Sequence, residues 1–216
     1  MNETENKDLT PVEQGETTAL ASSNASGYTP TMWNDDSLLK KAYKAAQFLA
    51  GSELVPEQTY RNKPQNCLIA LDLANRMNLM PLTVMQNLYI VKGKPSWSGQ
   101  FCIALVNGCG RFSPLDFTFT DENGGGCYAS ATRLSSGAFL KGTTVTMQMA
   151  KDEGWLDKSG SKWKTMPEQM LKYRAASFFA KSYCPDILHG IPTTEELQDV
   201  HGYTPEEKET VTIVMD

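Results

Sequence analysis

The sequence has few of the residues on which metal and nucleophile chemistry depends. It contains two histidines, and its five cysteines are odd in number and form no C-x-x-C pair. This composition does not support a zinc site, so we expect reduced cysteines that pack as small apolar side chains. The phosphate-loop, G-x-S-x-G and H-E-x-x-H motifs are also missing. We therefore expect no cofactor and no chemistry of the kinds that these motifs support.

Long apolar runs are absent as well. No stretch approaches the roughly 18 residues that a membrane-spanning helix needs. No charged-then-apolar signal pattern opens the chain. We therefore expect a cytoplasmic protein with no membrane partner. Its 216 residues suffice for one domain with a sizeable core, or for two small domains.

Charge is distributed unevenly along the chain. Residues 1–30 carry one lysine and five acids, residues 191–216 carry one lysine and seven acids, and residues 31–190 carry 18 basic and 13 acidic side chains. We interpret 1–30 as a disordered acidic tail, 31–190 as the core domain and 191–216 as an acidic C-terminal tail. A basic core suits a polyanionic partner, and the acidic tails would compete with that partner for the basic surface.

The stretch 86–110 combines positive charge with an aromatic residue. Its apolar pattern predicts a strand over 88–91 with both faces buried, and the turn that follows carries Lys92 and Lys94. Trp97 comes next, and Ser98 is placed to cap a helix. A cationic tip beside a ring suits phosphate and base, as in a sequence-tolerant nucleic-acid binder. The alternative is a hairpin with solvated lysines and a core tryptophan.

The rest of the chain predicts an α+β fold. Capping residues and helical spacing predict helices over 35–51 and 64–77. The first of them has an apolar stripe at Leu38, Ala42, Ala45 and Leu49. Alternating patterns predict strands over 115–120, 128–134 and 143–149, with a glycine-rich hairpin turn at 121–126. We expect a small antiparallel sheet, a hairpin plus a meander, packed against several helices.

The last long helix, predicted over 165–183, carries a cationic stripe. A capping box at Thr165 and Glu168 would start this helix. The stripe lies at three- and four-residue intervals and consists of Arg174, Ser177 and Lys181. The loop before it, 150–164, contains two tryptophans and four lysines, which is typical of a functional loop. The alternative is that these charges form a solvated face.

Two groups of residues could be interpreted as catalytic. Cys184 and His189 would form a nucleophile and a base, but neighbours in sequence seldom do so, and no orienting acid is evident. Three aspartates would bind a metal ion as in a nuclease, but they lie on different predicted elements; they are Asp72, Asp116 and Asp121. We therefore do not expect an enzyme.

Two motifs resemble a known family. The strand and turn LYIVKGKPSWSGQF are similar to the hairpin, followed by a helix, of the RecT/Redβ family of phage-encoded single-strand annealing proteins. The run W-x-x-M-P-E-Q-M-L-K-Y-R-A-A at 163–176 is similar to the family's closing helix, and it is the more specific motif. The sheet between the two has the expected order. The resemblance covers about residues 35–190, and no separate C-terminal domain follows, so the docking role usually placed there is in doubt.

The resemblance implies an ATP-independent protein that coats single-stranded DNA and pairs complementary strands in recombination. Such proteins assemble into rings or helical filaments around a basic groove. They work beside a 5′→3′ exonuclease and a host single-strand-binding protein, and Mg²⁺ would at most modulate DNA binding. A phage or prophage origin would follow. A passive single-strand coat protein and a metal-dependent nuclease are the alternatives.

The resemblance also implies which residues border the groove. By position these are Lys92 and Lys94 on the hairpin tip and Arg174 and Lys181 on the last helix. Charge and placement add Trp97 as a side chain that stacks on bases. The same reasoning adds three phosphate contacts, at Lys162, Lys164 and Lys172.

Overall fold

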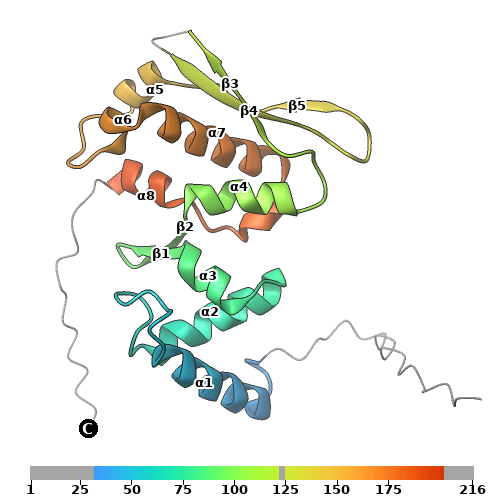
Figure 1. Cartoon of the computed structure of the whole chain (residues 1–216), viewed down its shortest axis with the longest axis vertical. Helices are drawn as coiled ribbons and strands as arrows, with labels where there is room; N and C mark the ends of the chain where they lie inside the picture. Colours follow the sequence, from blue (N-terminus) through green and yellow to red (C-terminus); the bar gives the residue numbers. More distant parts are fainter. Residues whose placement is uncertain (1–31, 122–124, 202–216) are drawn as a thin grey trace, which may run out of the picture.

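The computed structural model describes residues 32–121 and 125–201, which form an elongated α+β structure (Figure 1). The sequence of elements is α1 (Asp36–Ala50), α2 (Pro64–Met77), α3 (Pro81–Asn87), β1 (Leu88–Val91), β2 (Lys94–Trp97), α4 (Gly99–Gly108), β3 (Asp116–Thr120), β4 (Gly126–Thr132), β5 (Phe139–Lys141), β6 (Val145–Thr146), α5 (Met147–Asp152), α6 (Lys162–Thr165), α7 (Pro167–Tyr183), the 3₁₀ helix η2 (Pro185–Leu188) and α8 (Thr194–His201). The expected fold class is confirmed. The tail expected over 1–30 and most of the C-terminal tail lie outside the described residues.

Local capping sets the first two helices where the sequence predicts them. The Asp35 carboxylate caps α1 by accepting hydrogen bonds from two backbone N–H groups at 2.8 and 3.0 Å. The left-handed residue Asn78 ends α2. The stripe predicted for α1 is half right. Leu49 packs against the core and Ala42 is half-buried, but Leu38 and Ala45 are exposed. The buried residues of the helix are Ala46 and Ala50. Small residues on the buried faces let α1 and α2 approach closely.

The hairpin and the helix after it form as predicted, with one correction. β1 and β2 pair antiparallel, with Leu88 opposite Trp97, and the Ser98 side chain caps α4. Burial of both faces of β1 is wrong: Tyr89 and Ile90 point to opposite faces, and both are exposed. The sheet has only two strands, and of the residues of β1 only Leu88, at the base of the hairpin, is buried. Pro95 fits into β2 because an edge strand can lack one donor.

The larger sheet has the order β3-β4-β5, with β6 also paired to β4. All its pairings are antiparallel, as predicted. The strand expected over 143–149 is mostly wrong, because only Val145 and Thr146 pair. The Thr146 hydroxyl then caps α5 by accepting from the N–H of Met149 at 3.1 Å. The sequence pattern also missed β5 and α3.

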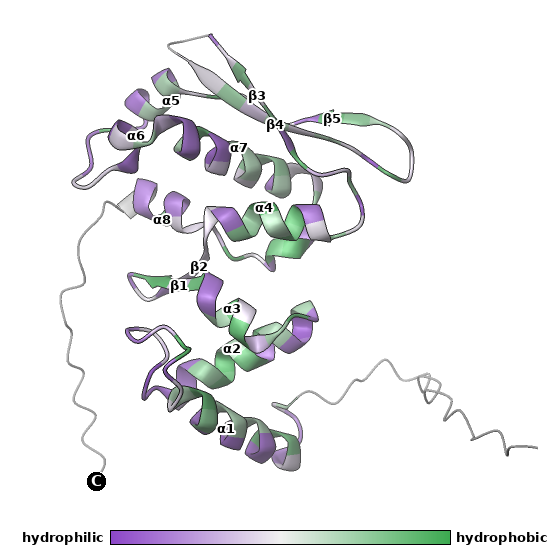
Figure 2. Ribbon diagram, in the orientation of Figure 1, coloured by the Kyte–Doolittle hydropathy of each residue, from purple (hydrophilic) through white to green (hydrophobic). Residues whose placement is uncertain are grey.

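Helix α7 lies between the sheet and α4 (Figure 1). Eight of its residues are buried, so it forms the centre of the core. The capping box predicted at its start is wrong: Thr165 ends α6, and α7 begins after Met166 without a side-chain cap. Gly99 lets α4 approach α7, since a Cβ built there would lie 2.7 Å from Cγ of Tyr173. The hydropathy of the neighbouring helices fits these positions. Helix α4, which packs on α7, is largely hydrophobic, whereas α8 is hydrophilic (Figure 2).

Candidate nucleic-acid interface

Trp97 is a core residue. Its side chain is fully buried, its indole N–H donates to the carbonyl of Leu188 at 3.2 Å, and its ring centroid lies 5.0 Å from that of Phe101. A buried ring offers no face on which a base could stack. The predicted stacking role is therefore wrong, and the alternative of a core tryptophan is right.

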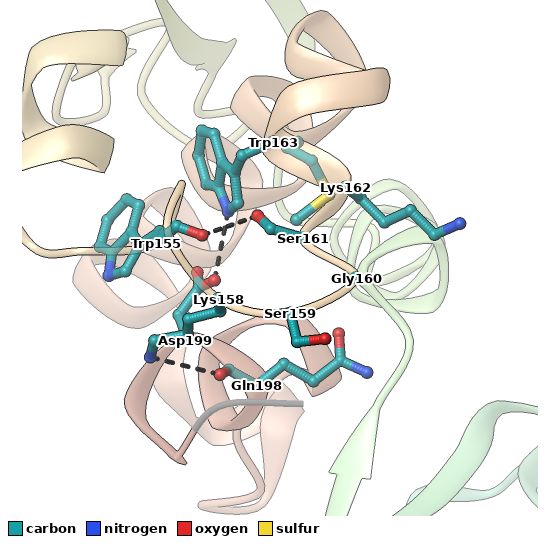
Figure 3. A pocket seen from close by; sticks show the side chains of 10 residues that line it. Trp155, Lys158, Ser159, Gly160, Ser161, Lys162, Trp163, Gln198 and Asp199 are labelled. Carbon is teal, nitrogen blue, oxygen red and sulfur yellow. Dashed lines mark hydrogen bonds between the residues drawn. The ribbon is translucent and has the colours of Figure 1, made fainter. Parts of the chain in front are cut away.

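The tryptophans of the loop 150–164 are also buried. The ring centroids of Trp155 and Trp163 lie 5.1 Å apart, and the Trp163 indole donates to the Asp199 carboxylate at 3.2 Å (Figure 3). The Lys158 ammonium donates to the Gln198 carbonyl at 3.4 Å. These contacts hold the loop against α8. The pocket between them, of about 30 Å³, has room for about one water molecule.

The stripe that the sequence predicts on α7 is exposed only at Lys181, since Arg174 and Ser177 are buried. Arg174 is 7% exposed and lies between the rings of Trp155 and Phe178, at 4.3 and 5.3 Å from their centroids. Acids from α8 face both cations, so the prediction of an acid-free stripe is wrong. The sequence pattern of α7 could not show these acids, because they come from a segment about 20 residues further along.

The acids of α8 hold this cluster together. Glu196 accepts from the Ser177 hydroxyl at 2.6 Å and from the Lys181 ammonium at 2.7 and 2.8 Å. Nη1 of Arg174 lies 3.7 Å from Oε1 of Glu196 and 3.7 Å from Oδ2 of Asp199. The boundary expected at 190 therefore falls inside the folded part of the chain. A capping box between Thr193 and Glu196 starts α8, and this signal could have been found in the sequence.

Burial and pairing shift the pKa values of these carboxyl groups in opposite directions. Burial raises the pKa of Asp199 to about 6, although the charge of Arg174 opposes the rise. Burial also raises the pKa of Glu195. Burial would do the same to Glu196, but hydrogen bonds from Lys181 and Ser177 outweigh it and hold that pKa below its usual range. Glu196 is thus the carboxylate most firmly ionised in the cluster.

The lysines of the hairpin tip are exposed. Lys92 and Gly93 both have positive φ, at 49° and 75°, which is the geometry of a two-residue type I′ turn. This turn carries Lys92 and Lys94 on the end of a rigid pair of strands. In Figure 1 the tip points to the same side of the molecule as the loop before α6.

The remaining predicted lysines lie on and near that loop and on α7. Lys162 and Lys164 are exposed on α6, and the Lys162 side chain extends away from the small pocket (Figure 3). Lys172 is half-buried, with its ammonium 5.5 Å from the centroid of the Phe119 ring. Within the described ranges, no ion pair joins these three lysines or Lys94 to an acid. Helix α8 contacts both the hairpin and the loop, so it links the two lysine groups.

The part of the chain that the structure describes contains no assembled site for either catalytic alternative, the cysteine nucleophile or the aspartate metal site. Cys184 is fully buried, and burial raises the pKa of its thiol to about 11, which disfavours the reactive thiolate. Asp72 pairs with Arg76 at 2.6 Å on the same helix. No cluster of three or more potential metal ligands occurs in 32–121 or 125–201.

Within residues 32–121 and 125–201, no helix is long and apolar enough to cross a membrane.

An antiparallel sheet on a central helix, with lysines on a projecting hairpin and on a loop, is an arrangement suited to binding a polyanion. A model of the RecT family matches residues 45–212, which is most of the chain. The chain therefore belongs to the RecT family, whose members bind DNA and anneal single strands in recombination. No curated protein and no solved structure matches the chain.

Proposed function

We propose that this protein binds single-stranded DNA through its phosphates and pairs it with a complementary strand without ATP. Membership of the RecT family is the observation that carries this proposal. The exposed lysines Lys92 and Lys94, on a hairpin held by four residue pairs, support it. We further place Lys162, Lys164 and Lys172 in the same interface. A 5′→3′ exonuclease would expose such strands, and a host single-strand-binding protein would compete for them.

The mechanism needs no bond to break. Two DNA strands repel each other and fold on themselves, and both effects slow their pairing. Cationic side chains release the counterions of the phosphate backbone and hold each strand extended. Because phosphate contacts leave the base edges free, the bound strand remains able to pair. Annealing then follows from charge neutralisation and from the high local concentration of strands.

A fluorescence-quenching assay with two complementary oligonucleotides tests this function. We expect the protein to accelerate annealing severalfold or more in the absence of ATP, with the oligonucleotides intact when Mg²⁺ is added. A protein that binds the strands but leaves the pairing rate unchanged would be a passive coat. Shortening of the DNA in Mg²⁺ would make it a nuclease. Either result would contradict the proposal.

The hairpin tip can be tested through the salt dependence of binding. We expect the double variant Lys92→Ala/Lys94→Ala to lower the slope of log K against log salt by up to about 1.4, since each phosphate contact on a single strand contributes about 0.7. The matched control is Lys40→Ala/Lys41→Ala, which removes two exposed lysines from α1. A slope equal to that of the wild type in the hairpin variant would exclude the tip from the interface.

We also propose that copies of the chain assemble through the end formed by α1 and α2. Six of the thirteen large apolar side chains exposed in the described residues lie between positions 33 and 69. Phe48 is 81% exposed, Leu54 72% and Ile69 58%. Such a concentration at one end of an elongated molecule is typical of a protein contact. A neighbouring copy that covers it with a different surface would build a ring or a filament.

The double variant Phe48→Glu/Leu54→Glu tests this contact. Charge at two exposed positions should leave the fold intact, as checked by circular dichroism, and should reduce the assembly to monomers in light scattering on a sizing column. Gln47→Glu, at an exposed position next to Phe48, is the control and should keep the oligomer. An oligomer of unchanged mass in the double variant would move the subunit contact elsewhere.

A further inference from the structure

A cationic hollow lies away from the lysine hairpin. It has a volume of about 360 Å³ and is formed by the segment that follows α4, the β4–β5 connection and the end of α7. Arg111 and Arg133 line it, together with Leu134 and Tyr183, and no acid is among the lining residues. In Figure 1 the β4–β5 connection and the β1–β2 hairpin lie on opposite sides of the molecule. The hollow is therefore a separate surface.

Backbone pairing holds the two arginines in place. Phe112 and Arg133 form an antiparallel bridge outside the named strands. The N–H of Leu134 donates to the Arg111 carbonyl at 3.0 Å, and the N–H of Ser113 donates to the Thr132 carbonyl at 2.9 Å. Two short segments are thus joined as in a sheet. Because their backbones are paired, the two arginine side chains project from fixed positions beside each other.

The two guanidinium groups differ in their partners. Arg111 donates two hydrogen bonds to the Asp186 carboxylate, at 3.1 and 2.9 Å, and these bonds hold the pKa of Asp186 below its usual range. This pair orients Arg111 and leaves it further N–H groups to donate. Arg133 is exposed and forms no ion pair within 32–121 and 125–201. The two arginines and Asp186 together carry one net positive charge.

We propose that this hollow binds a phosphate group of a nucleic-acid strand, as a second contact separate from the lysine hairpin. A guanidinium group donates two parallel hydrogen bonds, which match two oxygens of a phosphodiester. The exposed side chain of Leu134 and the ring of Tyr183 provide apolar surface beside the charge, against which a sugar or a base can lie. The inference rests on the proposed function, because it assumes that the protein binds single strands.

A surface of this kind has a plain use in annealing. Pairing brings two strands together on one assembly, and the hairpin tip offers contacts for only a few phosphates. A second cationic surface lets the assembly hold more backbone, or hold the incoming strand, without covering base edges. An acidic peptide would recognise similar charge, but a peptide would not make the affinity for DNA depend on Arg133.

Salt titration of single-stranded oligonucleotide binding tests the hollow with the variant Arg133→Ala. We expect the slope of log K against log salt to fall by about 0.7, which corresponds to one phosphate contact. Arg133→Lys, which keeps the charge, should retain the slope and lose only the bidentate geometry. The oligomer mass and the circular dichroism spectrum should equal those of the wild type in both variants.

Three results would overturn this assignment. The first is an unchanged slope in Arg133→Ala while the wild-type protein binds and anneals DNA, which would leave the proposed function intact. The second is loss of assembly in Arg133→Ala, which would make the hollow a subunit contact. The third is thermal stabilisation by dAMP that depends on Arg133 but occurs without any effect on strand binding, which would assign the hollow to a free nucleotide. If the wild-type protein did not bind DNA at all, the proposed function itself would be wrong.

Discussion

The buried guanidinium of Arg174 is the constraint on which the rest of the structure depends. A charge in the core is costly unless opposite charge offsets it, and here two aromatic rings and two carboxylates surround it. Both carboxylates lie 3.7 Å from Nη1, and within the described residues Nη1 and Nε form no hydrogen bond, so the contact is mainly ionic. These partners come from the tryptophan loop, from α7 itself and from α8. One side chain therefore contacts three successive elements of the chain, which are the tryptophan loop, α7 and α8.

This arrangement separates two uses of positive charge in one protein. Arg174 is enclosed, and Lys181 is engaged by Glu196, so both serve to hold α8 on α7. The lysines proposed to meet DNA stand instead on the hairpin tip and on α6, where they are exposed, and at the half-buried position 172 of α7. Exposed lysines lose little solvation on binding a backbone, which suits a protein that must grip and release strands of any sequence.

Local signals made the helices α1, α2 and α4 and the β1–β2 hairpin predictable. Asp35, Ser98 and Asn78 act within a few residues of themselves, so their caps are visible in the sequence. The strand expected over 143–149 failed because Thr146 serves as a cap, and a polar residue in an alternating pattern can play either part. The hairpin lysines of the candidate site were also predictable from a turn motif.

Burial of Trp97 and Arg174 was not predictable from their neighbours. Trp97 is enclosed because Pro192 and Leu188 return to it from about 90 residues away, and its backbone N–H donates to the Pro192 carbonyl at 2.9 Å. Arg174 is matched by acids in a segment whose composition suggests a solvated tail. A helical stripe read alone cannot distinguish a DNA-binding face from a face that acids of another helix cover.

The unfolding free energy of Arg174 variants tests the central claim most directly. The account predicts that Arg174→Met costs about 3–5 kcal/mol, because it leaves the buried Asp199 carboxylate without its cation and leaves Glu196 with Lys181 alone. Adding Glu196→Gln and Asp199→Asn to that variant should recover much of the loss, since the two buried carboxylates are then neutral and Lys181, which loses its partner, is exposed to water. Arg174→Met would contradict the account if it lowered the unfolding free energy by less than about 1 kcal/mol. A triple variant whose loss equals the sum of the three single losses would contradict it as well.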